Sequence, residues 1–313
     1  MDDRSDLAQV LTAQLGQGVL AFPLTAFTDD GESVSEAGCR RHLRHHLATG
    51  AAALFVACGT GEFASLTEAE YADVVALAAA ETDGRIPVLS GIGYGFGQAR
   101  RLAGIAAGAG IDGLLVMPPY LARGSDAGLV EYVRRIAAGT DLPLIVYLRD
   151  LMRVSTRALE QLAAIETVIG FKDGHSAFVE LQRARLALGP DFLLFNGSLT
   201  AEMQYRPYAS LGIRGYSSAV QAFVPEIAGA FFTAARDGDE ARMDELITGF
   251  YAPVVALRDR VPGYAVSLIK AGARLRGQPV GPVRAPLTDP TPDHLAELEL
   301  ITRRGLALVG ADL

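Results

Sequence analysis

Residues 168–174 read Val-Ile-Gly-Phe-Lys-Asp-Gly, an apolar run typical of a β-strand that ends in a lysine. Lysine is among the residues least often buried without a partner, so a lysine at the end of a buried strand needs an explanation. A desolvated lysine loses part of its proton affinity, and its free amine can attack a carbonyl to form a Schiff base. Taken alone, the segment leaves open that Lys172 only emerges into solvent after its strand.

Seven further apolar segments of β type accompany this one, with helical stretches between them. Near-continuous apolar strands separated by helices indicate a parallel sheet covered on both faces. Eight such units, ending near residue 236, predict an α/β fold of the (β/α)8 TIM-barrel type. A doubly wound open sheet is the alternative, but no GxGxxG motif opens the first unit. The predicted strands are residues 18–22, 53–57, 86–92, 113–117, 143–147, 168–172, 192–195 and 213–216.

The strand signals stop near Gly238, and helical patterns follow. Helices are predicted at 240–257, 265–275 and 292–308, with a proline-rich connector before the last. We therefore expect three parts: an N-terminal tail (1–17), a catalytic barrel (18–237) and a C-terminal helical extension (238–313). The extension is too apolar for a free tail, so it should pack on the barrel or on a neighbouring subunit.

Composition excludes several classes of protein. The chain has 313 residues, half of them hydrophobic, and a net charge of -8, which argues against nucleic acid as a partner. No apolar run reaches the roughly 20 residues needed to span a bilayer, and the first residues are acidic where a secretory signal is basic. We expect a cytoplasmic protein with no membrane partner. Cys39 and Cys58 belong to no CxxC pair and should be reduced packing residues.

A histidine cluster is the one sequence feature that could indicate metal. His42, His45 and His46 have helical i, i+3, i+4 spacing, but arginines flank them and would repel a cation. We interpret the cluster as a solvated helix face. No compact set of His, Asp and Glu follows the predicted strands, so no metal is expected.

Polar residues follow several predicted strands, at the end of a barrel where active sites lie. Gly59, Thr60 and Gly61 form a glycine-rich turn whose backbone N–H groups could converge on an anion. Tyr147 could shuttle a proton, and Arg149 could hold a carboxylate. Each has a simpler interpretation, because glycines also serve turn geometry and Tyr147 could be a core aromatic.

The seventh and eighth predicted strands are followed by small polar groups, Asn196, Ser217 and Ser218. These side chains could hydrogen-bond a hydroxylated substrate, although turn formation explains each equally well.

Five motifs in order give a specific resemblance. They are Gly-Thr-Gly-Glu-Phe at 59–63, Tyr-x-Arg-Asp at 147–150, Gly-Phe-Lys-Asp-Gly at 170–174, Tyr-Ser-Ser-Ala at 216–219 and Gly-Tyr-Ala-Val-Ser-Leu-Ile-Lys-Ala-Gly at 263–272. The chain resembles the 5-dehydro-4-deoxyglucarate dehydratases of the dihydrodipicolinate synthase and N-acetylneuraminate lyase superfamily. The resemblance implies that Lys172 is the Schiff-base lysine.

Three differences from the dihydrodipicolinate synthases support the resemblance to the dehydratases. The synthases have Gly-Thr-Thr-Gly-Glu, Pro-Tyr-Tyr and Tyr-Asn-x-Pro where this chain has Cys58-Gly-Thr-Gly-Glu, Pro119-Tyr-Leu and Tyr147-Leu-Arg-Asp. The chain also departs from the dehydratases: Leu148 replaces an asparagine, Ala64 an aromatic residue, and no proline precedes Thr200. These differences bear on the exact substrate, not on the imine chemistry.

The resemblance implies conversion of 5-dehydro-4-deoxy-D-glucarate to 2,5-dioxopentanoate, water and carbon dioxide, with Tyr147 as proton shuttle and a homotetrameric assembly. The partner is then a small keto-deoxy sugar diacid. A 2-keto-3-deoxy sugar-acid aldolase would use the same lysine and break a different bond. A non-catalytic sugar-acid sensor of this fold would not need both Lys172 and Tyr147, and a purely structural barrel would need neither the lysine nor the glycine-rich turn.

Overall fold

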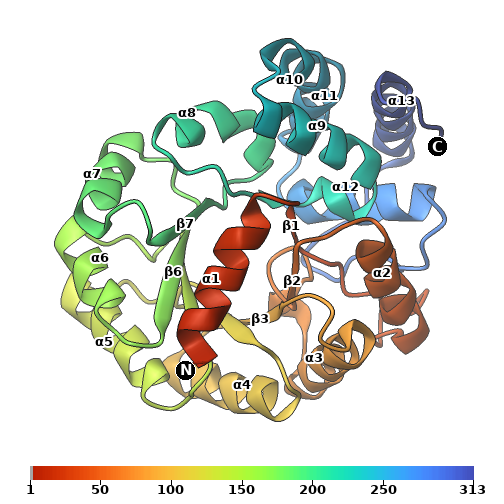
Figure 1. Ribbon diagram of the computed structural model, residues 1–313. Coiled ribbons are helices and arrows are strands. Elements are labelled where there is room, and N and C mark those ends of the chain that lie inside the picture. The colour runs from red at the N-terminus through yellow and green to blue at the C-terminus, as the bar shows by residue number, and fades with distance from the viewer. Residues whose placement is uncertain (1–2) are drawn as a thin grey trace.

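A computed structural model describes residues 3–313 and contains one sheet of eight parallel strands in the order β7-β6-β5-β4-β3-β2-β1-β8. A bridge between Asn196 and Tyr216 joins the two outer strands, so the sheet closes and the predicted (β/α)8 barrel is confirmed (Figure 1). The strands are β1 (Leu20–Ala21), β2 (Ala53–Val56), β3 (Val88–Ile92), β4 (Gly113–Val116), β5 (Leu144–Leu148), β6 (Val168–Asp173), β7 (Leu193–Asn196) and β8 (Ser217–Ser218).

The first seven strands overlap their predicted ranges, but the eighth does not. Residues 213–216 carry the apolar signal, whereas the residues that pair with β1 are Ser217 and Ser218. Ile213 is buried ahead of the strand, in the cluster between the sheet and the helices. The position of β8 is therefore set by backbone pairing with β1, which a hydrophobicity pattern does not reveal.

Helices surround the barrel, and several begin at a serine or threonine whose side chain accepts a backbone N–H of the first turn. Thr67, for example, forms a capping box with Glu70, each side chain accepting the other residue's backbone N–H. The helices of the barrel are α2 (Glu36–Ala48), α3 (Glu68–Thr82), α4 (Phe96–Gly108), α5 (Asp126–Ala137), α6 (Thr156–Ala163), α7 (Phe178–Leu188), α8 (Tyr205–Ser210) and α9 (Pro225–Asp237).

The predicted N-terminal tail contains a helix, α1 (Asp3–Leu15), that lies across one end of the barrel (Figure 1). Leu11 is buried with the barrel interior, and Leu7 lies close to Gly113 at the start of β4. Helix α1 therefore covers the amino-terminal end of the strands, opposite the end where active sites of this fold lie.

The C-terminal extension packs on the barrel, as one of the two sequence interpretations expects. It consists of α10 (Glu240–Leu246), a π-helical turn (Ile247–Tyr251), α11 (Ala252–Arg258), α12 (Tyr264–Leu275) and α13 (Pro292–Leu308). Phe250 and Tyr251 share a buried cluster with Phe231 of α9, and Figure 1 shows α10, α11 and α13 gathered beside α9. We propose the division at 237/238, because α9 ends at Asp237.

The interpretation of the histidine cluster as a solvated face is wrong. His42 and His46 are fully buried, and the two rings contact each other. His42 Nδ1 lies 2.5 Å from the side-chain oxygen of Gln278, and its Nε2 accepts the backbone N–H of Leu24. Burial lowers the pKa of His42 to about 4, so it is a neutral core residue. Cys39 and Cys58 are buried free thiols, as predicted.

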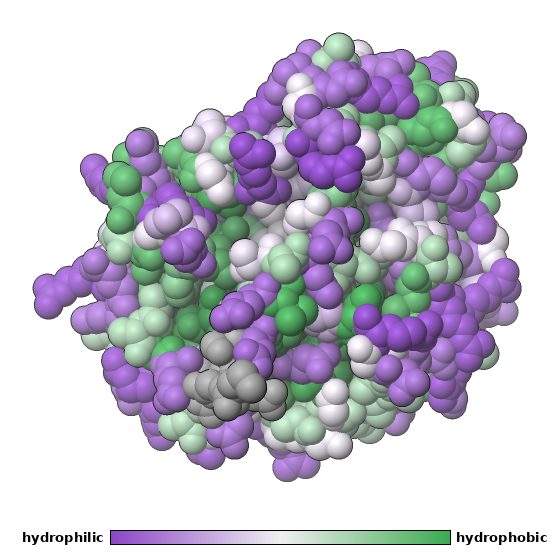
Figure 2. Space-filling model, viewed as in Figure 1, coloured by the Kyte–Doolittle hydropathy of each residue, from purple (hydrophilic) through white to green (hydrophobic). Residues whose placement is uncertain are grey.

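Figure 2 shows hydrophilic residues over most of the outer rim and hydrophobic residues toward the middle of the face viewed. None of the helices in residues 3–313 combines the length and apolarity that a bilayer span requires.

Candidate active site

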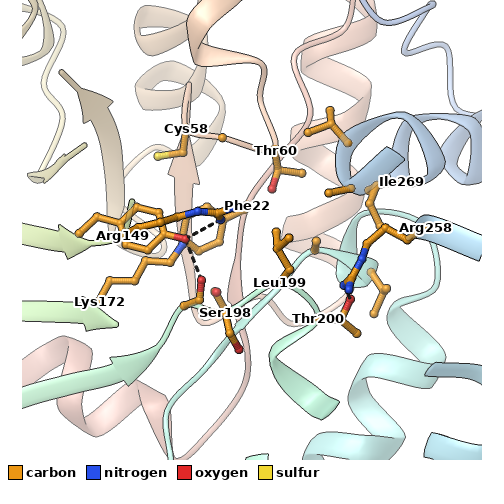
Figure 3. Close-up of a pocket in the computed structure, with 18 of the residues that line it drawn as sticks. Phe22, Cys58, Thr60, Arg149, Lys172, Ser198, Leu199, Thr200, Arg258 and Ile269 are labelled. Atoms are coloured by element: carbon orange, nitrogen blue, oxygen red, sulfur yellow. Dashed lines mark hydrogen bonds between the residues drawn. The ribbon is translucent and has the colours of Figure 1, made fainter. Parts of the chain in front are cut away.

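A cavity of about 300 Å³ lies at the carboxyl ends of the strands and is bounded on one side by α12. Its wall combines barrel and extension: Lys172 of β6, Tyr147 of β5, the turn after β2, the loop after β7, and Leu268 with Ile269 of α12. Figure 3 shows several of these side chains converging on the cavity. The volume matches that of small-molecule sites.

Lys172 lies inside the barrel, because β-strand alternation turns its neighbours Phe171 and Asp173 toward the helices. Its Nζ is 3.7 Å from the centre of the Phe22 ring and 4.3 Å from that of Tyr147. Burial lowers the pKa of Lys172 to about 7. A large share of this side chain is therefore a free amine near neutral pH, as a nucleophile must be.

Gly197 is shaped around this lysine. A Cβ atom at Gly197 would lie 2.4 Å from both Cγ and Cε of Lys172, so any larger residue would displace the amine. The glycine after β7 is thus a steric requirement of the lysine position, and not only a turn residue.

The whole sequence has only two lysines, Lys172 and Lys270. Lys270, in α12, is also buried, but its Nζ donates to Glu62 at 2.6 Å. Lys172 lines the cavity, whereas Lys270 is engaged behind it with Glu62. The geometry therefore separates one lysine suited to attack a carbonyl from one held in an ion pair.

Tyr147 and Arg149 lie beside Lys172 in one hydrogen-bond chain. The Tyr147 hydroxyl donates to the Gly197 carbonyl at 2.8 Å and accepts from Arg149 Nη1 at 3.1 Å. Burial raises the pKa of Tyr147, so the phenol keeps its proton at neutral pH. A neutral phenol at this position can relay a proton, because its oxygen can take up one proton as it gives up its own.

The glycine-rich turn faces the cavity only in part. Gly59 and Thr60 line it, and a Cβ atom at Gly59 would meet nothing within 4 Å. Gly61 lies behind them, where its carbonyl accepts from the Thr25 hydroxyl at 2.7 Å and a Cβ atom would lie 3.1 Å from the carbonyl oxygen of Pro23. Gly61 therefore shapes the turn, whereas Gly59 and Thr60 face the cavity.

The polar residues at the end of β7 and in β8 also differ in whether they face the cavity. Ser217 lines the cavity, but Asn196 is buried and holds the loop. Its side chain accepts from Ser198 N–H at 3.0 Å and donates to the Ala201 carbonyl at 2.9 Å. Ser218 donates at 2.5 Å to Glu202.

Three charged residues of the cavity wall, Asp150, Glu202 and Arg258, are not among the residues predicted to form the site. Glu202 follows the β7 loop and is buried, with Oε2 unpaired among the described residues. Burial raises the pKa of Glu202 to about 7. Arg258 comes from α11, in the extension. Glu202 carries a weak signal, a carboxylate six positions after Asn196, whereas no sequence pattern places a residue of the extension in the barrel.

Metal ligands do not assemble in the described part of the chain. Residues 3–313 contain no group of three or more His, Cys, Asp or Glu side chains placed to hold an ion.

Known proteins resemble this chain over nearly its full length. A sequence model of the Dihydrodipicolinate synthetase family matches residues 16–304. A relative from Streptomyces coelicolor, named probable 5-dehydro-4-deoxyglucarate dehydratase 2, is 54% identical over 99% of this chain and 96% of its own. A protein from Ralstonia nicotianae, named probable 5-dehydro-4-deoxyglucarate dehydratase, is 43% identical over 93% of this chain and 94% of its own.

Solved structures share the fold at low sequence identity. Dihydrodipicolinate synthase from Oceanobacillus iheyensis superposes with a TM-score of 0.85 at 23% identity, over 94% of this chain and 98% of that one. N-acetylneuraminate lyase from Mycoplasma synoviae gives 0.80 at 23% identity, over 93% and 98%. The chain therefore belongs to the dihydrodipicolinate synthetase family, on the branch that contains proteins named probable 5-dehydro-4-deoxyglucarate dehydratases.

Proposed function

We propose that the chain is a Schiff-base lyase that converts 5-dehydro-4-deoxy-D-glucarate to 2,5-dioxopentanoate, water and carbon dioxide in sugar diacid breakdown. The observation that carries the proposal is Lys172, a buried lysine with a lowered pKa at the wall of a small-molecule cavity. The names of the relatives supply the substrate.

The first half of the reaction is a dehydration. The Lys172 amine adds to the keto carbon C5 and loses water, which leaves a protonated imine as electron sink. Tyr147 takes a proton from the adjacent deoxy carbon C4 as it passes its own proton to the C3 hydroxyl, and the resulting enamine expels that hydroxyl as water. The hydrogen bonds of Tyr147 to Gly197 and Arg149 hold its oxygen beside the lysine during this transfer.

The second half is a decarboxylation through the same imine. The new C3–C4 double bond is conjugated with it, so the electrons of the C1–C2 bond can flow toward nitrogen as carbon dioxide leaves. Protonation turns the C2 enol into an aldehyde, and hydrolysis frees Lys172. Neither step needs a metal or an organic cofactor, and we expect turnover to persist after dialysis against EDTA.

The decisive test is mass spectrometry after reduction with borohydride in the presence of substrate. The adduct should appear on the peptide that contains Lys172, and Lys172→Ala should abolish both adduct and turnover. Because the only other lysine is Lys270, an adduct there would contradict the assignment. So would a Lys172→Ala variant that keeps a tenth of the wild-type activity.

Product analysis separates the dehydratase from the aldolase alternative. Dehydration releases carbon dioxide and 2,5-dioxopentanoate, whereas aldol cleavage of the C3–C4 bond would release pyruvate and a three-carbon aldehyde acid. A sensor would bind the diacid without releasing either set of products.

We also propose a cytoplasmic homotetramer. Exposed large apolar side chains support self-association, and Tyr120, Leu121, Val179 and Leu186 are each more than half exposed in the single chain. Sedimentation velocity of the purified protein measures the assembly directly.

A further inference from the structure

We propose that Arg258, together with Thr200, binds the distal carboxylate of the diacid and so selects diacids over monoacids. This inference rests on the function proposed above and adds the group that recognises the far end of the substrate. The first observation is its position: the side chain comes from the C-terminal extension and forms part of the cavity wall. Figure 3 shows Arg258 on one side of the cavity and Lys172 with Arg149 on the other.

The contacts of Arg258 leave much of its guanidinium available. Nη1 donates to the Thr200 hydroxyl at 2.7 Å, and Nε donates to Asp259 at 2.7 Å. A guanidinium carries five N–H donors, so these two contacts occupy only part of its fork. The side chain of Asp259 is 60% exposed, whereas that of Arg258 is 15% exposed. The solvated carboxylate of Asp259 contacts the guanidinium of Arg258 only at Nε, so it compensates the positive charge only in part.

The apolar surroundings strengthen the attraction between this guanidinium and an anion, and the nearby Glu202 carboxyl, whose pKa burial raises to about 7, is only partly ionised at neutral pH. Apolar side chains, Val254, Leu199 and Ile269, line the same cavity, and a guanidinium that is only 15% exposed interacts more strongly with an anion there than in water. A bidentate fork matches the geometry of a carboxylate. Thr200 adds a hydroxyl, and its left-handed backbone (φ 51°) turns the loop after β7 toward α11.

The other two cationic side chains of the cavity, Arg149 and Lys172, lie where the keto end of the substrate would bind. Arg149 donates to the Tyr147 hydroxyl, which places it beside the imine carbon. Lys172 forms the imine itself. In a six-carbon keto diacid bound through C5, the C1 carboxylate lies at the opposite end of the carbon chain, and Arg258 is the cationic side chain that the cavity presents there.

The expected kinetic effect follows from the fate of that carboxylate. C1 loses its charge as it becomes carbon dioxide, so Arg258 stabilises bound substrate at least as well as the decarboxylation transition state. In a variant that lacks the Arg258 guanidinium, the rise in KM should therefore be larger than the fall in kcat.

The test compares two imine-forming probes that differ only at the distal end, 2-oxoadipate and 2-oxohexanoate. The concentration dependence of borohydride trapping gives an apparent affinity for each without requiring turnover. Wild type should prefer 2-oxoadipate by roughly 30-fold or more, as expected for an enclosed charge pair. Arg258→Gln should abolish the preference, and Arg258→Lys should restore part of it.

Arg260→Gln is the matched control, because Arg260 lies two positions away on the surface, paired with Glu297. It should keep the preference. Trapping of pyruvate by Arg258→Gln at the wild-type rate would show that its imine site is intact. If Arg258→Gln does not fold, the preference is measured with Arg258→Lys alone. A preference that survives in either Arg258 variant at wild-type size overturns the proposal, as does a wild type with no preference. Turnover of 5-dehydro-4-deoxy-D-glucarate by wild type tests the proposed function separately.

Discussion

Lys270 donates a hydrogen bond of 2.6 Å to Glu62, a residue 208 positions earlier in the chain. Both side chains are almost fully buried, and Glu62 directly follows Gly61 of the glycine-rich turn. The second carboxylate oxygen of Glu62 accepts the backbone N–H of Arg284 at 2.9 Å. These two hydrogen bonds hold the C-terminal extension against the turn whose residues Gly59 and Thr60 line the cavity.

Removing one partner of this pair should destabilise the protein strongly. Lys270→Met leaves the Glu62 carboxylate buried without its cation, and we expect a loss of about 3 to 5 kcal/mol in the free energy of unfolding. Urea denaturation measures it, with Arg303→Met as control. Arg303 pairs with Glu299 on the surface, so its loss should change stability by about 1 kcal/mol or less. Similar losses in the two variants would contradict this view of the pair.

Imine formation should follow the pKa of Lys172. Because that pKa is about 7, the free amine dominates above neutral pH, and the rate of trapping should rise from about pH 6 and level off near pH 8. Pyruvate with cyanoborohydride gives this rate across the range. A rate that keeps rising toward pH 10, as for an ordinary lysine, would show that Lys172 is not desolvated.

Glu202 should make stability depend on pH. Its pKa is raised from 4.5 to about 7, so between these values the native state holds a proton that the unfolded chain has released. Raising the pH through this window therefore lowers the free energy of unfolding, by up to about 3 kcal/mol.

Glu202→Gln keeps the shape and removes the titration. The variant should match wild type near pH 4.5 and exceed it above pH 7, in urea denaturation at each pH. Glu131→Gln, an exposed residue paired with Arg134, should show no such trend. A stability difference that is constant with pH would mean that Glu202 is not protonated in the native state.

Local pattern predicts most of this barrel, and the exceptions have identifiable causes. Apolar runs such as 168–172 mark strands because both faces of the sheet are covered, whereas Ser217 and Ser218 form a strand that only pairing with β1 defines. The charge pattern around His42 gives no hint that Gln278, far along the chain, buries the ring.

The same contrast between local sequence pattern and tertiary contact applies to the site residues. Lys172, Tyr147, Gly59 and Thr60 end strands or follow them, so barrel topology brings them together from sequence alone. Arg258 reaches the cavity because α11 packs beside the barrel, and that packing depends on tertiary contacts. Sequence order does not encode them in any local pattern.

The glycine-rich turn should hold the keto-side carboxylate. Gly59 and Thr60 line the cavity with Lys172, and a carboxylate seated on their N–H groups and the Thr60 hydroxyl would fix the keto carbon for attack. Thr60→Val keeps the β-branched shape and removes one donor to a charged group. We expect a loss of about 1.5 to 3 kcal/mol, or roughly 10- to 150-fold in kcat/KM.

A crystal soaked with pyruvate distinguishes the turn from its rival, Arg149. Pyruvate has only the keto-side carboxylate and should form the imine at Lys172, so the position of that carboxylate identifies its binding group. Arg149 already donates to the Tyr147 hydroxyl, and this bond would have to break or be shared if the guanidinium bound the carboxylate instead. We expect the carboxylate within hydrogen-bond distance of the Gly59 and Thr60 N–H groups, with Arg149 still on Tyr147. A carboxylate on Arg149 without contact to residues 59–61 would assign the role to the arginine.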